Sequence, residues 1–170
     1  GRCGRSGPTS CACATDLAWG AVQDSVTLHI EAPVAKVWEL VSDVTHIGRF
    51  SPETFEAEWL DDATGPAVGV RFRGHVRRNG RGPVYWTTCT IVRCEPEREF
   101  AFVVGKPSKK MMTWGYRLAP AGTGTDVTEF WESADTFAMR LYWKLVPARK
   151  RTNAEGMRTT LERLKVAAET

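Results

Sequence analysis

The 170-residue sequence lacks the features of membrane and secreted proteins. It has no apolar run near the roughly 20 residues that cross a bilayer, and its N-terminus has no apolar segment typical of a signal peptide. We therefore expect a cytoplasmic protein without a membrane span. The net charge of +3 is too small to predict nucleic acid as a partner, although five arginines cluster around one predicted hairpin. These are Arg71, Arg73, Arg77, Arg78 and Arg81, which are typical of a solvated face.

The sequence is also poor in patterns that would support metal binding or nucleophilic catalysis. Its five cysteines are irregularly spaced, and Cys11 and Cys13 have no nearby ligands to complete a zinc site. Cys89 and Cys94 fit as small strand residues. No Ser/His/Asp order and no phosphate-binding glycine loop is found. We expect neither a metal nor a cofactor.

Alternating apolar residues predict about seven strands. The first covers residues 24–31, where Val26, Leu28 and Ile30 share a face. Two short helices follow, over residues 34–42 with Pro33 in the first turn and over 44–50 with Asp43 as N-cap. Six more strands follow without helical crossovers, so the sheet should be antiparallel.

A long amphipathic helix is predicted over residues 138–169. Its apolar face contains Val146, Asn153, Met157, Thr160, Leu161 and Leu164. Pro147 should kink or break the helix, with residues 136–146 as a separate short helix or as the rim of the cavity. Such a helix should lie across the curved sheet, giving an α+β fold. Residues 1–23 are rich in glycine and small polar residues and are predicted to form a flexible tail, so a single domain should span residues 24–170.

Four segments carry a resemblance to a known superfamily. They are Ala-Pro-Val-Ala-Lys-Val-Trp-Glu-Leu-Val-Ser-Asp (32–43), Gly-Val-Arg-Phe-Arg-Gly (69–74), Gly-Thr-Asp-Val-Thr-Glu (124–129) and Met-Arg-Thr-Thr-Leu-Glu-Arg-Leu-Lys (157–165). With the element order, they resemble the SRPBCC superfamily, which has the START-like, helix-grip fold of the birch-pollen allergen. The chain is most similar to its bacterial polyketide cyclase/dehydrase-like branch. That branch includes cyclases and lipid carriers, so the resemblance implies a fold more than an activity.

The alternation predicts that many large side chains point between the sheet and the long helix. Aromatic walls with few polar groups suit flat, apolar ligands such as polyketides, sterols or aromatic acids. The alternative is that the rings fill the core. Phe55 and Thr88 are also placed on inner faces. The predicted ligand-binding residues are Phe50, Phe72, Trp86, Phe102, Trp114, Tyr116, Glu129, Trp131, Asn153 and Met157.

Three residues are candidates for acid or base chemistry. Glu129 shares a strand face with Val127 and Trp131, so its carboxyl group should point inward, where burial would raise its pKa. The alternative places it at a wet rim of the sheet. Tyr116 could bond a ligand or a backbone carbonyl, and His46 lies near a plausible pocket entrance.

The sequence supports three functional hypotheses. The first is a protein that binds or carries a hydrophobic small molecule. The second is a polyketide cyclase or aromatase that uses the same cavity, with catalysis mainly by positioning. The third is a protein-interaction module with a filled core. Convergence of Glu129, His46 and Tyr116 on one space would favour the enzyme, while the oligomeric state is left open, with a homodimer as one option.

Overall fold

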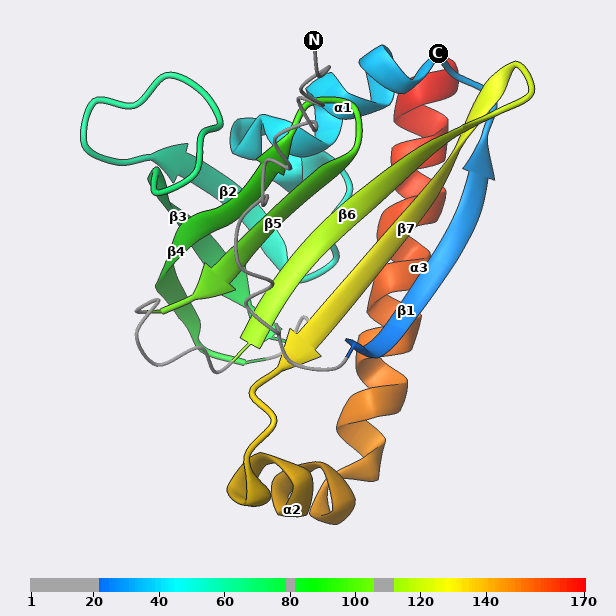
Figure 1. Ribbon diagram of the computed structural model, residues 1–170. Coiled ribbons are helices and arrows are strands. Elements are labelled where there is room, and N and C mark those ends of the chain that lie inside the picture. Colours follow the sequence, from blue (N-terminus) through cyan, green and yellow to red (C-terminus); the bar gives the residue numbers. More distant parts are fainter. Residues whose placement is uncertain (1–21, 79–81, 106–111) are drawn as a thin grey trace, which may run out of the picture.

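The computed structural model describes residues 22–78, 82–105 and 112–170. One sheet curves around a long helix that lies across it (Figure 1). The predicted N-terminal tail therefore lies almost wholly outside the described residues, as does Arg81. The seven strands are β1 (Val22–Ile30), β2 (Thr54–Trp59), β3 (Arg71–Arg77), β4 (Val84–Glu95), β5 (Glu99–Val104), β6 (Met112–Ala121) and β7 (Gly124–Ser133).

The sheet is antiparallel throughout, as predicted, and its spatial order is β1-β7-β6-β5-β4-β3-β2. The first and last strands are therefore neighbours. The two short helices, α1 (Val34–Ser42) and η1 (Val44–Arg49), carry the chain from the β1 edge to the β2 edge. The predicted cap is confirmed, because an Asp43 carboxylate oxygen accepts a hydrogen bond from the Thr45 amide at 3.0 Å.

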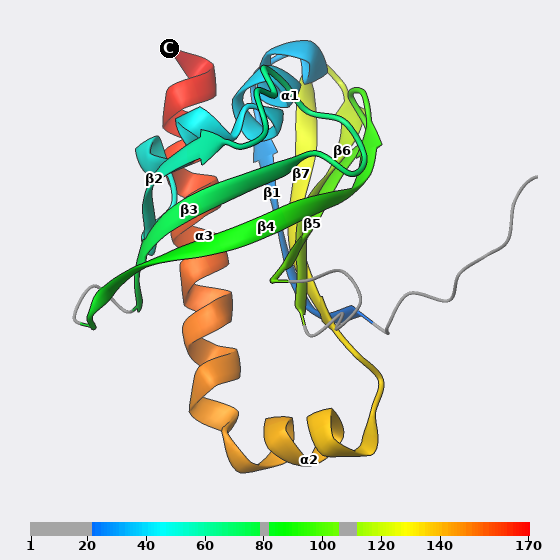
Figure 2. The same ribbon diagram turned by 90° about the vertical axis from the view of Figure 1, so that its left-hand side faces the viewer.

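The predicted break at Pro147 is also confirmed. Helix α2 (Phe137–Leu145) ends just before it, and α3 (Pro147–Glu169) begins with it. Proline is tolerated there because the first helical N–H has no partner within the helix. Helix α3 crosses the sheet, and α2 lies at the end of the molecule where α3 begins (Figures 1 and 2). Among the described helices, none is long and apolar enough to cross a membrane.

Two clusters of buried side chains pack between the sheet and the helices. The larger cluster includes Ile30, Val37, Phe50, Phe100 and Leu161. The smaller one joins Trp131 of β7 to Trp143 of α2 and Met157 of α3. The face of α3 that was predicted to be apolar is buried, including Asn153 and Thr160.

The predicted facing of β4 is wrong over its first half. Trp86 is 40% exposed and Thr88 is exposed on the outer face of the sheet, while Cys89 is buried on the inner face. The Trp86 ring stacks on His75 of β3 at 4.3 Å, under the guanidinium group of Arg73 at 4.5 Å. Large side chains therefore also alternate on the outer face of β4. The sequence pattern resembles that of a buried face, and for this reason Trp86 was assigned to the wrong face.

Phe55 was also predicted to point inward, and this is wrong. It is exposed and contacts the ring of His75 at 4.5 Å on the outer face. The pairing of β2 with β3 shifts register between Thr54 and Glu56, which changes the face on which the intervening residue lies. A single irregularity of this kind is not visible in the alternation of the sequence.

The outer face of the sheet carries a cluster of charges over a buried ring. Phe130 lies under Arg117, whose guanidinium carbon is 4.1 Å from the ring centre, and Arg93 lies 5.4 Å away. Arg93 pairs with Glu99 at 2.9 Å and with Glu132 at 3.2 Å. Of the described helices, α3 and α2 lie on the other side of the sheet (Figure 2).

Candidate functional site

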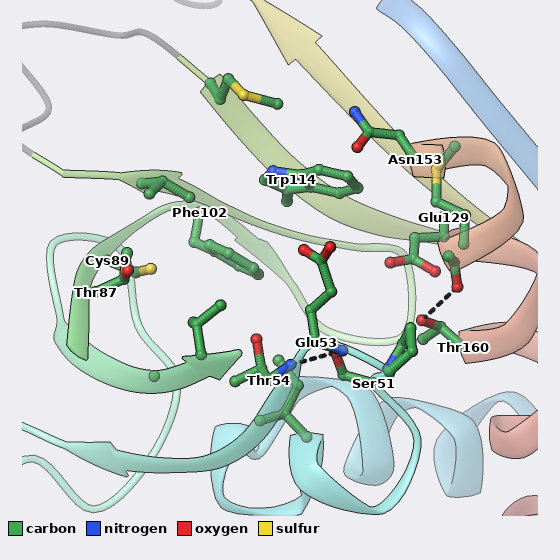
Figure 3. Close-up of a pocket in the computed structure, with 18 of the residues that line it drawn as sticks. Ser51, Glu53, Thr54, Thr87, Cys89, Phe102, Trp114, Glu129, Asn153 and Thr160 are labelled. Carbon is green, nitrogen blue, oxygen red and sulfur yellow. Dashed lines mark hydrogen bonds between the residues drawn. The ribbon is translucent and has the colours of Figure 1, made fainter. Parts of the chain in front are cut away.

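A pocket of about 340 Å³ lies between the concave face of the sheet and α3. Its apolar wall is formed by Phe72 of β3, Phe102 of β5, Trp114 of β6 and Met157 of α3 (Figure 3). In an antiparallel sheet, the side chains of directly paired residues lie on the same face. Neighbouring strands therefore each contribute one or two of these side chains. The rings leave a space rather than filling it, which argues against the filled-core hypothesis.

One end of the pocket lies near the surface and forms its mouth. Tyr85 and Arg78, both exposed, line it from the end of the β3–β4 hairpin. Arg149 in the first turns of α3 faces Glu53 across the mouth, with 3.5 Å between Nη1 and Oε1. The Ser51 hydroxyl accepts a hydrogen bond from the Thr54 amide at 3.0 Å and so fixes the turn that carries Glu53 (Figure 3).

The opposite, buried end of the pocket is polar. Tyr116 of β6 and Glu129 of β7 are directly paired in the sheet, which puts both side chains on the inner face. The Tyr116 hydroxyl donates to Oε1 of Glu129 at 3.4 Å, and Glu129 is only 7% exposed. Within the described part of the chain, the other carboxyl oxygen, Oε2, has no hydrogen-bond partner.

Burial controls the protonation of this pair. It raises the pKa of the Glu129 carboxyl group well above its ordinary value, and the neighbouring hydroxyls of Tyr116 and Thr160 only partly oppose the rise. Burial also raises the pKa of Tyr116, and the nearby Glu129 adds to the effect. The inward orientation predicted for Glu129 is therefore confirmed, and its environment favours the neutral carboxylic acid.

Asn153 is a second unsatisfied polar group in the pocket wall. It lies on α3, is 5% exposed, and its Nδ2 has no hydrogen-bond partner among the described residues. Figure 3 shows Asn153 and Glu129 on neighbouring parts of the same pocket. A buried polar atom without a partner costs about 1–3 kcal/mol, so water or a bound molecule is expected at both positions.

The structure brings together most of the predicted ligand-binding residues, although their role in binding stays a prediction. The ones that line the pocket are Phe72, Phe102, Trp114, Tyr116, Glu129, Asn153 and Met157. Trp86 points to the outer face, so its predicted place in the wall is wrong. Phe50 and Trp131 are inward but are fully packed, Phe50 in the larger cluster and Trp131 against the Trp143 ring at 4.5 Å.

Of the three candidates for acid or base chemistry, only two converge. Tyr116 and Glu129 share the buried end of the pocket, whereas His46 lies on η1, is half-exposed and does not line the pocket. The helix turns His46 toward Asp43, with 4.0 Å between Nδ1 and Oδ2, while Ile47 faces the pocket instead.

The residues at the mouth were not predicted from the sequence. Arg149 was assigned to the solvated face of the long helix, and Glu53 follows Ser51-Pro52, where no element was predicted. The two meet only because the helix begins at Pro147 and crosses the η1–β2 turn. Their opposite charges were the only signal in the sequence, and charge alone does not identify a partner so distant along the chain.

No group of three or more His, Cys, Asp or Glu side chains that could hold a metal ion occurs in residues 22–78, 82–105 and 112–170. Cys89 lines the pocket, and burial raises the pKa of its thiol to about 12. At neutral pH this thiol is therefore protonated and contributes to the wall as a small apolar group.

Comparisons with known proteins agree with this architecture. The family described as "Polyketide cyclase / dehydrase and lipid transport" matches residues 21–169. A comparison with curated proteins found no match. The di-domain ARO/CYC StfQ from the steffimycin biosynthetic pathway superposes with a TM-score of 0.63 at 15% identity, over 86% of this chain and 50% of that one.

Two other solved structures are similar to this chain over nearly their whole length. Protein NE0264 from Nitrosomonas europaea has a TM-score of 0.60 at 16% identity, covering 85% of this chain and 92% of that chain. The AHSA1-like protein from Aeromonas hydrophila has a TM-score of 0.58 at 21% identity, covering 85% and 92%. At these identities the likenesses show a shared fold.

Proposed function

Because the chain belongs to the polyketide cyclase / dehydrase and lipid transport family, we propose that it binds a hydrophobic small molecule in the pocket between the sheet and α3. One observation carries the proposal. The pocket of about 340 Å³ has aromatic walls and ends in two buried polar atoms without partners, Oε2 of Glu129 and Nδ2 of Asn153, among the described residues. Small-molecule sites occupy about 300–1,000 Å³, are mostly apolar and use a few polar groups for orientation.

The lining supports a ligand with a flat apolar body and an oxygen at one end. Phe102 and Trp114 provide ring faces for the body. The Asn153 Nδ2 is a donor and needs an acceptor such as a carbonyl oxygen. In its protonated form, which burial favours, the Glu129 carboxyl group can donate to the same oxygen or accept from a hydroxyl group. An aromatic or polyketide-like ketone or phenol, or a lipid with a polar end, has this chemistry.

A second candidate function is cyclisation of a poly-β-keto chain, and the buried carboxyl group of Glu129, whose pKa is raised by burial, favours it. When an aldol-type ring closes, a carbonyl oxygen gains a proton while the attacking carbon loses one. In its protonated form Glu129 can supply the first proton, and the carboxylate so formed can accept the second, so the side chain returns to its starting state. Tyr116 would then act by holding the carboxyl group at 3.4 Å.

The test of the binding proposal is native mass spectrometry of the purified protein, followed by a titration with an apolar fluorophore monitored by tryptophan fluorescence. We expect saturable binding that Trp114→Ala weakens. Trp86→Ala, an equal truncation on the outer face, is the matched control and should keep the affinity. No bound molecule and no saturable binding would overturn the proposal. Turnover of a poly-β-keto surrogate that Glu129→Gln removes, with binding retained, would favour the cyclase.

A further inference from the structure

Helix α2 exposes an apolar stripe to solvent. Phe137, Leu141 and Leu145 recur every four residues, which places them on one side of the helix. Phe137 is 83% exposed and Leu145 is 72% exposed, and the neighbouring Leu141 and Tyr142 are exposed too. Scattered apolar residues are normal on a surface, but a continuous stripe along one helix marks an interaction site.

The opposite side of α2 fixes the helix in this orientation. Trp143 is buried, its Nε1 donates to the Ser133 hydroxyl at 3.2 Å, and its ring lies 4.5 Å from Trp131. The helix is also capped, because the Thr136 hydroxyl accepts a hydrogen bond from the Met139 amide at 3.2 Å. The stripe cannot turn inward without breaking these contacts.

The charge around the stripe is mainly positive. Residues 136–153 contain Arg140, Lys144, Arg149, Lys150 and Arg151 but no aspartate or glutamate. Arg140 is paired with Asp135 and Arg149 with Glu53. For Lys144, Lys150 and Arg151, the described residues provide no ion pair. An apolar stripe flanked by uncompensated cations is the composition of a helix that lies in an anionic membrane surface.

We propose that α2 and the first turn of α3 dock on an anionic lipid surface, with Phe137, Leu141 and Leu145 in the acyl boundary and the cations on headgroup phosphates. A second copy of this chain is a poorer occupant, because facing copies would bring the cations Lys144, Lys150 and Arg151 of one copy against those of the other. The docking surface also adjoins the pocket mouth, since Arg149 lies in the first turn of α3, soon after Leu145. Docking would therefore bring the mouth to the lipid, although the inference does not require the pocket to be a carrier site.

The test is flotation of the full chain with vesicles of phosphatidylcholine, with and without phosphatidylglycerol. We expect binding only to the anionic vesicles, weakened by added salt. Phe137→Ser with Leu145→Ser should reduce the affinity about tenfold or more, because two large side chains no longer enter the lipid. Lys144→Gln and Lys150→Gln should each reduce it about fivefold. The matched control is Val166→Ser, which removes a side chain 67% exposed near the other end of α3 and should change nothing.

Three outcomes would overturn the proposal. The first is no binding to anionic vesicles. The second is equal binding by the Phe137→Ser/Leu145→Ser variant, whose circular dichroism should match the unaltered protein. The third is a homodimer that this double variant dissociates, because a second copy would then be the occupant. A protein that binds vesicles but no apolar fluorophore would leave this inference standing and overturn only the proposed binding function.

Discussion

The Tyr116 hydroxyl lies 3.4 Å from Oε1 of Glu129, and the two residues are direct partners on β6 and β7. An acid is thus held in an apolar pocket by a neighbour whose own ionisation is suppressed, since burial raises the pKa of both groups. The sheet register fixes this pair and does not depend on a loop conformation. The pocket therefore keeps its polar end whether or not a ligand is present.

Glu129→Gln should make the folding stability less dependent on pH. The Glu129 pKa is raised on folding, so above its ordinary value of 4.5 the unfolded chain loses this proton before the folded chain does. Stability is then lost as pH rises from that value toward the raised pKa, and a glutamine avoids the loss. Thermal unfolding should show similar melting temperatures at about pH 4 and a more stable variant at about pH 7. A variant that is equally destabilised at both pH values would contradict this.

Gly156→Ala should stabilise the protein by about 0.5–1 kcal/mol, because alanine is the better helix former. An added Cβ would meet only Cγ of Pro52, at 4.0 Å. The contrasting variant is Gly115→Ala. Its Cβ would lie 2.6 Å from the Phe100 carbonyl oxygen, so this substitution should be clearly destabilising. Urea unfolding measures both.

Gly156→Leu should fill the pocket and weaken fluorophore binding without unfolding the chain.

Trp143→Ala should cost about 3–5 kcal/mol of stability, because it empties a buried site and leaves the Ser133 hydroxyl without its donor. Tyr142→Ala is the adjacent control, since Tyr142 is about half-exposed, and it should have a much smaller effect. Chemical denaturation compares the two. Equal losses would mean that α2 is not anchored through Trp143.

His29 should stabilise the fold mainly at acidic pH. Its Nδ1 lies 2.7 Å from Oδ1 of Asp126, and this hydrogen bond is the main cause that raises the His29 pKa above 6.5. A raised histidine pKa contributes stability below the ordinary pKa, and the contribution is lost as pH rises through the raised value. Asp126→Asn should lower the pKa that an NMR titration of His29 reports. An unchanged midpoint would show that the contact is absent in solution.

Sequence periodicity was sufficient for the order of elements and for the inner face of most strands. In β6 and β7 the apolar alternation follows the inner face, so the alternation alone was enough to place Tyr116 and Glu129 there. It failed in β2 and β4, where aromatic residues also cover the outer face and one register shift reverses the facing. The mouth could not be predicted because Glu53 and Arg149 belong to elements that meet only after the chain has folded.

Phe130 follows Glu129 in β7, so the two side chains lie on opposite sides of one strand. Glu129 faces the pocket, and Phe130 is sealed from water by the Arg117 and Arg93 guanidinium groups and their carboxylate partners. The wall behind the pocket is therefore a single peptide layer whose outer seal is ionic.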